Sequence, residues 1–201
     1  MHRLTYTFLI LFLLSFTLAT RAQNLVIEVG AAAGNVVGQK HTLGKGEFHL
    51  NLLKSFQFGQ LGLDFANGGN FIPGESSRTE GNVETLSPND SRFGVITALY
   101  RLPIGKQFFV EPRLGYASLY YYVHTDDARR IAEPNFTAGI GIGAKLPNMT
   151  ISLRYQYLGK TANYEGFRDT ELVQLKGTPL ALILFRFSYR FELDALFGKK
   201  K

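Results

Sequence analysis

The stretch NFTAGIGIGAKLPNMTISLRYQY, residues 135–157, alternates apolar and polar residues, stops once at Pro147 and Asn148, and then resumes the alternation. Side chains two residues apart point to the same face of a β-strand. Two such runs joined by a short turn predict a β-hairpin with one apolar face. Each arm has about ten residues, which at ~3.3 Å per residue and a tilt near 45° crosses roughly the apolar part of an outer membrane. The hairpin therefore indicates a membrane barrel.

The N-terminus has the three parts of a secretory signal peptide. A basic start with Arg3 precedes the apolar run 8–18, and small residues at Thr20 and Ala22 suit a cleavage site. An uncleaved inner-membrane anchor is the alternative, but the apolar run is shorter than the ~20 residues of a spanning helix. We therefore expect residues 1–22 to be removed as a signal peptide and residues 23–201 to form a single outer-membrane β-barrel domain.

Composition narrows the chemistry. The 201 residues include no cysteine, which excludes a disulfide, a lipid-attached cysteine and a thiolate metal site. Removal of Arg3 and Arg21 with the signal takes the formal charge from +6 to +4 (6 − 2), which gives no reason to expect a nucleic-acid partner. The four histidines are too dispersed for a metal constellation. We expect no cofactor.

The alternation predicts eight strands in the mature chain, an even number as bacterial outer-membrane barrels require. The fourth is the least regular, because both of its faces carry apolar residues. The predicted strands are 25–33, 47–56, 60–66, 93–102, 109–123, 135–146, 149–157 and 180–191. The expected fold is all-β, an eight-stranded antiparallel up-and-down transmembrane β-barrel.

The predicted connections alternate in length. Short ones lie around 55–58, 103–106 and 147–148, and long ones cover 34–46, 67–91, 124–134 and 159–178. Outer-membrane barrels have tight turns in the periplasm and long loops outside. An extracellular ligand would therefore be met by the four long connections, whose mixed charges and glycines name no particular partner.

Alternation alone does not say which face is inside, because a soluble barrel such as a lipocalin alternates too. Gly139, Gly141 and Gly143 occupy the polar face of one strand, where room for bulky side chains across a narrow lumen would explain them. The other face has large aliphatic and aromatic residues and almost no charge; Lys54, near a turn, can snorkel. We therefore expect the apolar face to contact lipid.

This pattern, from Gln23 to about Phe191, resembles the small eight-stranded outer-membrane barrels typified by OmpX and the transmembrane domain of OmpA. The resemblance lies in pattern and loop layout, with no specific motif beneath it. It implies the outer membrane of a Gram-negative bacterium, contact with outer-membrane lipid, and recognition of an aromatic last strand by the barrel assembly machinery. The residues that look like that assembly signal are Phe185, Phe187, Tyr189 and Phe191. Two departures are the lack of a glycine within that strand and the extra residues 192–201.

The polar face would form a crowded lumen, since eight strands leave an interior just wide enough for side chains. Charges at such depth are tolerated when paired. The candidate lumen charge network consists of Glu28, Asp64, Glu111, Arg113, Lys145, Arg154, Arg186 and Arg190. A structural plug with a structural or surface-interaction role is the first interpretation; a narrow channel or transporter for small solutes is the second.

A lipid-modifying enzyme is the third class considered. Lipid A deacylases of this size share a His-x-Ser type motif, and here no histidine has a serine two residues later. The best remaining pair is His124 beside Asp126 and Asp127 at the outer rim, a place where a solvated histidine is the ordinary meaning. We expect no catalytic residues.

Overall fold

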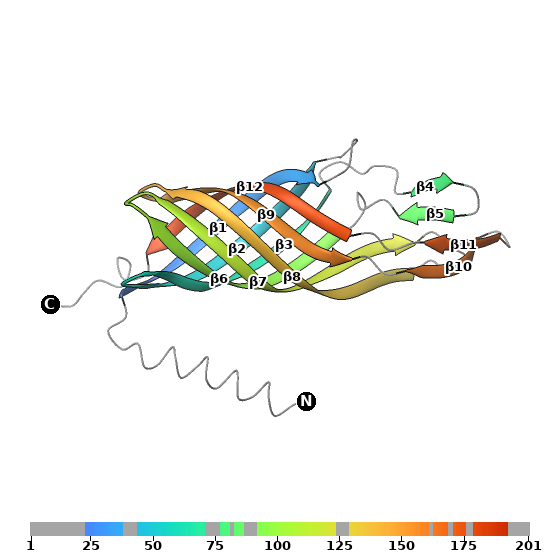
Figure 1. Cartoon of the computed structure of the whole chain (residues 1–201), viewed down its shortest axis with the longest axis horizontal. Helices are drawn as coiled ribbons and strands as arrows, with labels where there is room; N and C mark the ends of the chain where they lie inside the picture. Colours follow the sequence, from blue (N-terminus) through green and yellow to red (C-terminus); the bar gives the residue numbers. More distant parts are fainter. Residues whose placement is uncertain are drawn as a thin grey trace, which may run out of the picture.

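The chain forms a closed β-barrel with a smaller sheet beyond one of its ends (Figure 1). Its structure is a computed structural model that describes residues 23–37, 44–70, 77–80, 83–86, 92–123, 129–160, 163–168, 171–175 and 179–192. The predicted signal peptide, 1–22, lies outside these ranges. Within them, no helix has the length and hydropathy needed to span a membrane.

Eight antiparallel strands make the barrel, in the circular order β1-β12-β9-β8-β7-β6-β3-β2. Each strand neighbours its sequence neighbour in the barrel, and β1 closes on β12 from Val26 opposite Glu192 to Val36 opposite Leu182. The predicted fold class is thus confirmed. The strands are β1 Gln23–Val36, β2 Lys45–Phe56, β3 Gly59–Asn70, β6 Arg92–Ile104, β7 Phe108–Val123, β8 Arg129–Lys145, β9 Met149–Lys160 and β12 Pro179–Glu192.

Most strands run further than predicted, chiefly into the long connections. β3 continues through Gly68 and Gly69, whose backbones pair with β2 although they lack the side chains that make a strand legible in sequence. β8 begins at Arg129, inside a predicted loop, because β7 supplies paired backbone as far as Val123. Backbone pairing thus extends strands beyond their alternating segments.

Two of the long connections contain strands that the alternation pattern did not predict. They are β4 Ser77–Glu80 and β5 Val83–Leu86 between β3 and β6, and β10 Tyr164–Arg168 and β11 Glu171–Leu175 between β9 and β12. β5 pairs in parallel with β11, which joins the two hairpins into one four-stranded sheet. Figure 1 places this sheet beyond the barrel end opposite the short turns.

Large apolar side chains cover the outside of the barrel, as predicted. Phe48 and Tyr116 are 78% and 69% exposed, whereas their neighbours His49 and Ala117 are buried on the inner face. In the hairpin of residues 135–157, Ile140 and Leu153 are likewise on the outside. A soluble barrel would bury this set, so the facing favours a wall surrounded by lipid.

A buried charge network as the candidate functional site

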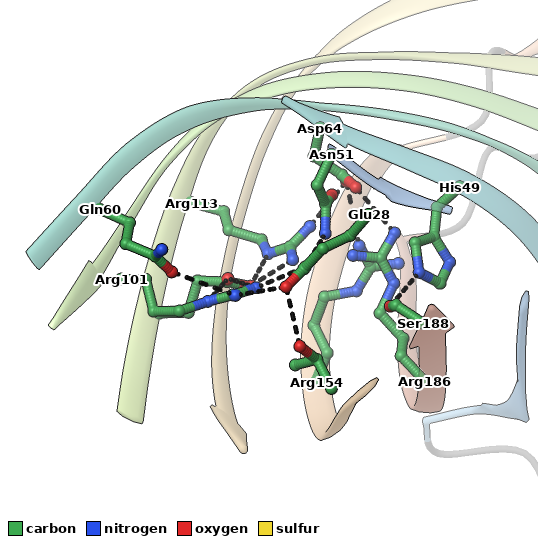
Figure 2. A network of polar contacts seen from close by, with 12 residues as sticks. Glu28, His49, Asn51, Gln60, Asp64, Arg101, Arg113, Arg154, Arg186 and Ser188 are labelled. Atoms are coloured by element: carbon green, nitrogen blue, oxygen red, sulfur yellow. Dashed lines mark hydrogen bonds and ion pairs between the residues drawn. The ribbon is translucent and has the colours of Figure 1, made fainter. Parts of the chain in front are cut away.

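Eight charged side chains form one continuous network across the middle of the lumen. Figure 2 shows part of this network, around Glu28, Asp64 and Arg101. Seven of the eight barrel strands contribute to it. The carboxylates are Glu28, Glu47, Asp64 and Glu111, and the guanidinium groups are those of Arg101, Arg113, Arg154 and Arg186. Four negative and four positive groups give this network no net charge (−4 + 4 = 0). Such balance is what low-dielectric surroundings demand of buried ions.

Arg101 of β6 joins two carboxylates at the end of the network nearer the short turns. Its Nη1 lies 2.8 Å from Glu28 Oε1 and its Nη2 lies 2.7 Å from Glu111 Oε2. The guanidinium carbon sits 4.2 Å from the centroid of the Phe109 ring. A planar guanidinium that both pairs with carboxylates and stacks on an aromatic ring is held in one orientation, which a lysine could not reproduce.

Asp64 of β3 connects the other arginines. Its Oδ2 accepts a hydrogen bond from Arg113 Nη1 at 2.6 Å, and its Oδ1 accepts one from Arg186 Nη2 at 2.8 Å. Arg113 also pairs with Glu111. Glu47 of β2 closes the far end by pairing with Arg154 and accepting a hydrogen bond from Arg186 Nε at 2.9 Å. Each carboxylate therefore contacts at least one arginine from another strand.

Neutral side chains complete the contacts. Glu28 accepts hydrogen bonds from Asn51 Nδ2 at 3.0 Å and Thr150 Oγ1 at 2.7 Å. His49 Nε2 lies 2.8 Å from Ser188 Oγ, and its Nδ1 lies 3.7 Å from Glu47 Oε1. This has the order of a nucleophile, base and acid, but Ser188 and His49 are 3% and 4% exposed and two arginines hold Glu47. The arrangement serves lumen packing.

Three glycines of strand β8 leave room for the side chains of neighbouring strands in the lumen. A Cβ at Gly143 would come within 2.4 Å of Phe109 Cζ, and one at Gly139 within 2.6 Å of Gln156 Oε1. At Gly141 it would meet the Cβ atoms of Arg154 and Glu111, both at 3.9 Å. The prediction that these glycines make room for side chains in a narrow lumen is therefore confirmed at Gly139 and Gly143, where the clash is direct.

Apolar side chains share the lumen with the charges. Val26, Leu53 and Leu99, from β1, β2 and β6, form a small buried cluster. Towards the long connections lies a larger cluster, which the predicted polar inner face did not include. Its members are Ala32, Val36, Ala66, Phe93, Val95, Ala117, Leu119, Leu158, Leu180, Leu182 and Leu184. The lumen thus holds apolar clusters as well as the charge network.

Of the eight predicted network residues, the structure brings five into direct contact with one another, joins Glu28 to them only through Arg101, and leaves two apart. Lys145 is exposed and lines a cavity of about 220 Å³ at the end with the short turns. Arg190 pairs with Glu192 near that end, at 2.9 Å. The five are Asp64, Glu111, Arg113, Arg154 and Arg186.

Two central residues, Arg101 and Glu47, were missed. Arg101 shares its face of β6 with Phe93, Val95 and Leu99. Because these neighbours are apolar, the sequence did not show that this face points into the polar lumen. Glu47 stood at the edge of a predicted strand, but β2 begins two residues earlier and carries it into the lumen. The signal that would have identified Arg101 is a charged residue among alternate positions that are otherwise apolar and face the lumen.

Two other predicted sites remain to be placed: the assembly signal in the last strand and the candidate catalytic pair at His124. The aromatic residues of the expected assembly signal all lie on the outer face of β12, with the Tyr189 and Phe191 ring centroids 4.8 Å apart. His124, Asp126 and Asp127 fall outside the described residues. Within the described ranges, no three His, Cys, Asp or Glu side chains are grouped so as to hold a metal ion.

Comparison with known proteins gives a likeness in fold. No protein-family model matches the chain, and no curated protein matches it in sequence. Among solved structures, Neisserial surface protein A (NspA) aligns with a TM-score of 0.58 at 12% identity, covering 85% of this chain and 98% of that one.

A second similar structure is Ail, the attachment invasion locus protein of Yersinia pestis, with a TM-score of 0.54 at 16% identity over 84% of this chain and 98% of that one. Ail in complex with the heparin analogue sucrose octasulfate gives 0.51 at 17% identity, with 84% and 99% covered. Nearly the whole of each of these proteins is therefore matched, and the chain has the fold of small eight-stranded outer-membrane barrels.

Proposed function

We propose that the chain is an integral protein of the Gram-negative outer membrane whose barrel is a non-conducting anchor for a cell-surface contact region. The observation that carries the proposal is the filling of the lumen, in which a neutral charge network and two apolar clusters are buried. Residues 1–22 would serve as the cleavable export signal, and residues 23–201 as the barrel domain.

The outer wall supports the membrane location. Its side chains include Phe48, Leu114, Ile142 and Phe185, each more than half exposed. Strands of 12 to 17 residues are long enough to cross the hydrocarbon layer when tilted. Closure through β1 and β12 leaves no strand edge to be satisfied within lipid.

The lumen supports an anchor over a channel. An ion entering from the side of the long connections would meet Phe93, Leu119 and Leu182, which are fully buried and offer no ligand. Next it would meet arginines and carboxylates already paired with one another, so that passage would require breaking those pairs. Both barriers act against conduction.

The surface role rests on the region beyond the barrel. The sheet β4-β5-β11-β10 brings two long connections together and lies where a partner outside the cell could reach it. Ail, of similar fold, is named as an attachment invasion locus protein and was solved with a heparin analogue. By analogy of fold, we assign contact with an extracellular ligand to connections 34–46, 67–91, 124–134 and 159–178.

Conductance of refolded protein in planar bilayers separates anchor from channel. We expect no unitary steps for the wild type. Leu182→Gly combined with Leu119→Gly should still be silent, because the charge network remains. Steady unitary conductance of the wild type, altered in selectivity by Asp64→Asn, would make the channel the better account.

The surface role has its own test. A variant in which residues 77–86 and 164–175 are replaced by short Gly-Ser segments should reach the outer membrane and remain heat-modifiable on gels. Its cells should lose binding to immobilised sulfated glycans or host-cell surfaces that wild-type cells bind. Unchanged binding would exclude the β4-β5-β11-β10 sheet as the contact region.

Cleavage of the signal peptide has a separate test. N-terminal sequencing of the mature protein should begin at Gln23.

A further inference from the structure

A broad groove crosses the outer wall of the barrel in the half next to the long connections. Its volume is about 620 Å³, within the ~300–1,000 Å³ typical of small-molecule sites. It reaches residues of six neighbouring strands, β1, β2, β3, β6, β7 and β8. At ~4.8 Å between strands, that is a width of roughly 24 Å around the wall.

The groove exists because small outward residues lie side by side in neighbouring strands. Asn67 of β3 is opposite Gly94 of β6, and Gly94 is opposite Ser118 of β7. Large side chains stand around this row and form the walls. They include Phe48, Phe65, Ile96, Tyr116 and Tyr120. Aromatic walls fixed by a barrel backbone are a preformed surface, so an occupant need not order them.

Shape alone gives little affinity inside a membrane, because lipid tails are as apolar as the wall itself. Selection needs a polar contact beside the groove. Arg92 does not line the groove, but it lies opposite Tyr120 of β7, which does. Arg92 is exposed, begins β6, and lies on the same outward face as Gly94, two residues nearer the long connections. Within the described part of the chain it has no ion pair. A guanidinium at that height can bind a phosphate in bidentate fashion.

We propose that this groove is a binding site for lipid A, with acyl chains over Gly94 and Ser118 and a phosphate on Arg92. Outer-membrane barrels have their long loops outside the cell, so the half of the wall beside the long connections faces the outer leaflet. In Gram-negative outer membranes the lipid of that leaflet is lipopolysaccharide, whose membrane anchor is lipid A. The width of the groove fits an amphiphile with several chains better than one with two. The large side chains that wall the groove, such as Phe48, Ile96 and Tyr116, point away from the lumen.

Filling the groove tests the proposal. Gly94→Phe places a ring in it, and the variant should fold, because a Cβ at Gly94 meets only Tyr120 Cε2 at 3.8 Å. Ala98→Phe is the matched control: Ala98 is exposed on the same face of the same strand but does not line the groove. Arg92→Gln removes the phosphate contact. Heat-modifiability on gels verifies that each variant is folded.

The measurement is native mass spectrometry of protein extracted from outer membranes in mild detergent, with lipid A quantified per barrel. We expect wild type and Ala98→Phe to retain one lipid A, Gly94→Phe to lose it about tenfold, and Arg92→Gln to lose it several-fold. Equal retention by Gly94→Phe and Ala98→Phe would overturn the proposal. So would a phospholipid, a second copy of the chain, or no bound molecule at all on the wild type.

Discussion

Glu111 offers the sharpest test of the lumen network, because it is buried and shared by two arginines. Arg101 Nη2 lies 2.7 Å from it and Arg113 also pairs with it. Glu111→Gln keeps the shape and removes the charge, leaving three carboxylates for four guanidinium groups (4 − 1 = 3). Removal of one partner from a buried pair costs about 3 to 5 kcal/mol. That is roughly two to three and a half powers of ten in the folding equilibrium.

The assay is urea unfolding of the barrel in lipid vesicles, followed by circular dichroism and by heat-modifiability. Glu192→Gln is the control, since Glu192 is a carboxylate 41% exposed in its pair with Arg190 and should cost at most about 1 kcal/mol. Glu111→Gln with Arg113→Met restores neutrality (−3 + 3 = 0) and should recover most of the loss, because Asp64 keeps Arg154 and Arg186.

Equal unfolding midpoints for Glu111→Gln and wild type would refute the reasoning. Combined with a changed ion selectivity, they would mean that water solvates the unpaired arginine and that the lumen is a hydrated pore.

Three further predictions concern the wall, the glycine strand and assembly. Ile140→Arg should lower the unfolding free energy by about 2 to 4 kcal/mol if Ile140 is near the bilayer midplane, whereas Ile104→Arg, beside a short turn, should cost about 0 to 1 kcal/mol; equal costs would contradict a lipid-facing belt. Gly143→Ala should destabilise by about 1 to 3 kcal/mol because its Cβ would overlap Phe109, and Phe109→Leu should relieve part of that, so an additive double variant would argue against the contact. Serine at all three of Phe187, Tyr189 and Phe191 should leave the chain degraded in the periplasm; normal amounts of heat-modifiable barrel in outer-membrane fractions would exclude an assembly signal there.

The strands and their facing followed from sequence because both are local properties. The period of two in 135–157 needs only neighbouring residues to be legible, and it correctly assigned Ile140 and Leu153 to the outside. Turn length likewise depends on a few adjacent residues, as at Pro147 and Asn148. The number of barrel strands, their closed antiparallel order and the outward apolar belt were therefore determined by the sequence itself.

The tertiary structure decided which side chains meet. Alternation places Glu28 and Asp64 inside, but the stagger of the closed barrel determines which arginines lie at the same height. Barrel closure places Arg101, whose neighbours on the inner face of β6 are apolar, against Glu28, 73 residues away in sequence. It leaves Lys145 at the rim. The parallel pairing of β5 with β11 joins segments some ninety residues apart, which no local pattern encodes. Charge partners and loop pairing depend on closure of the whole barrel, whereas strand identity does not.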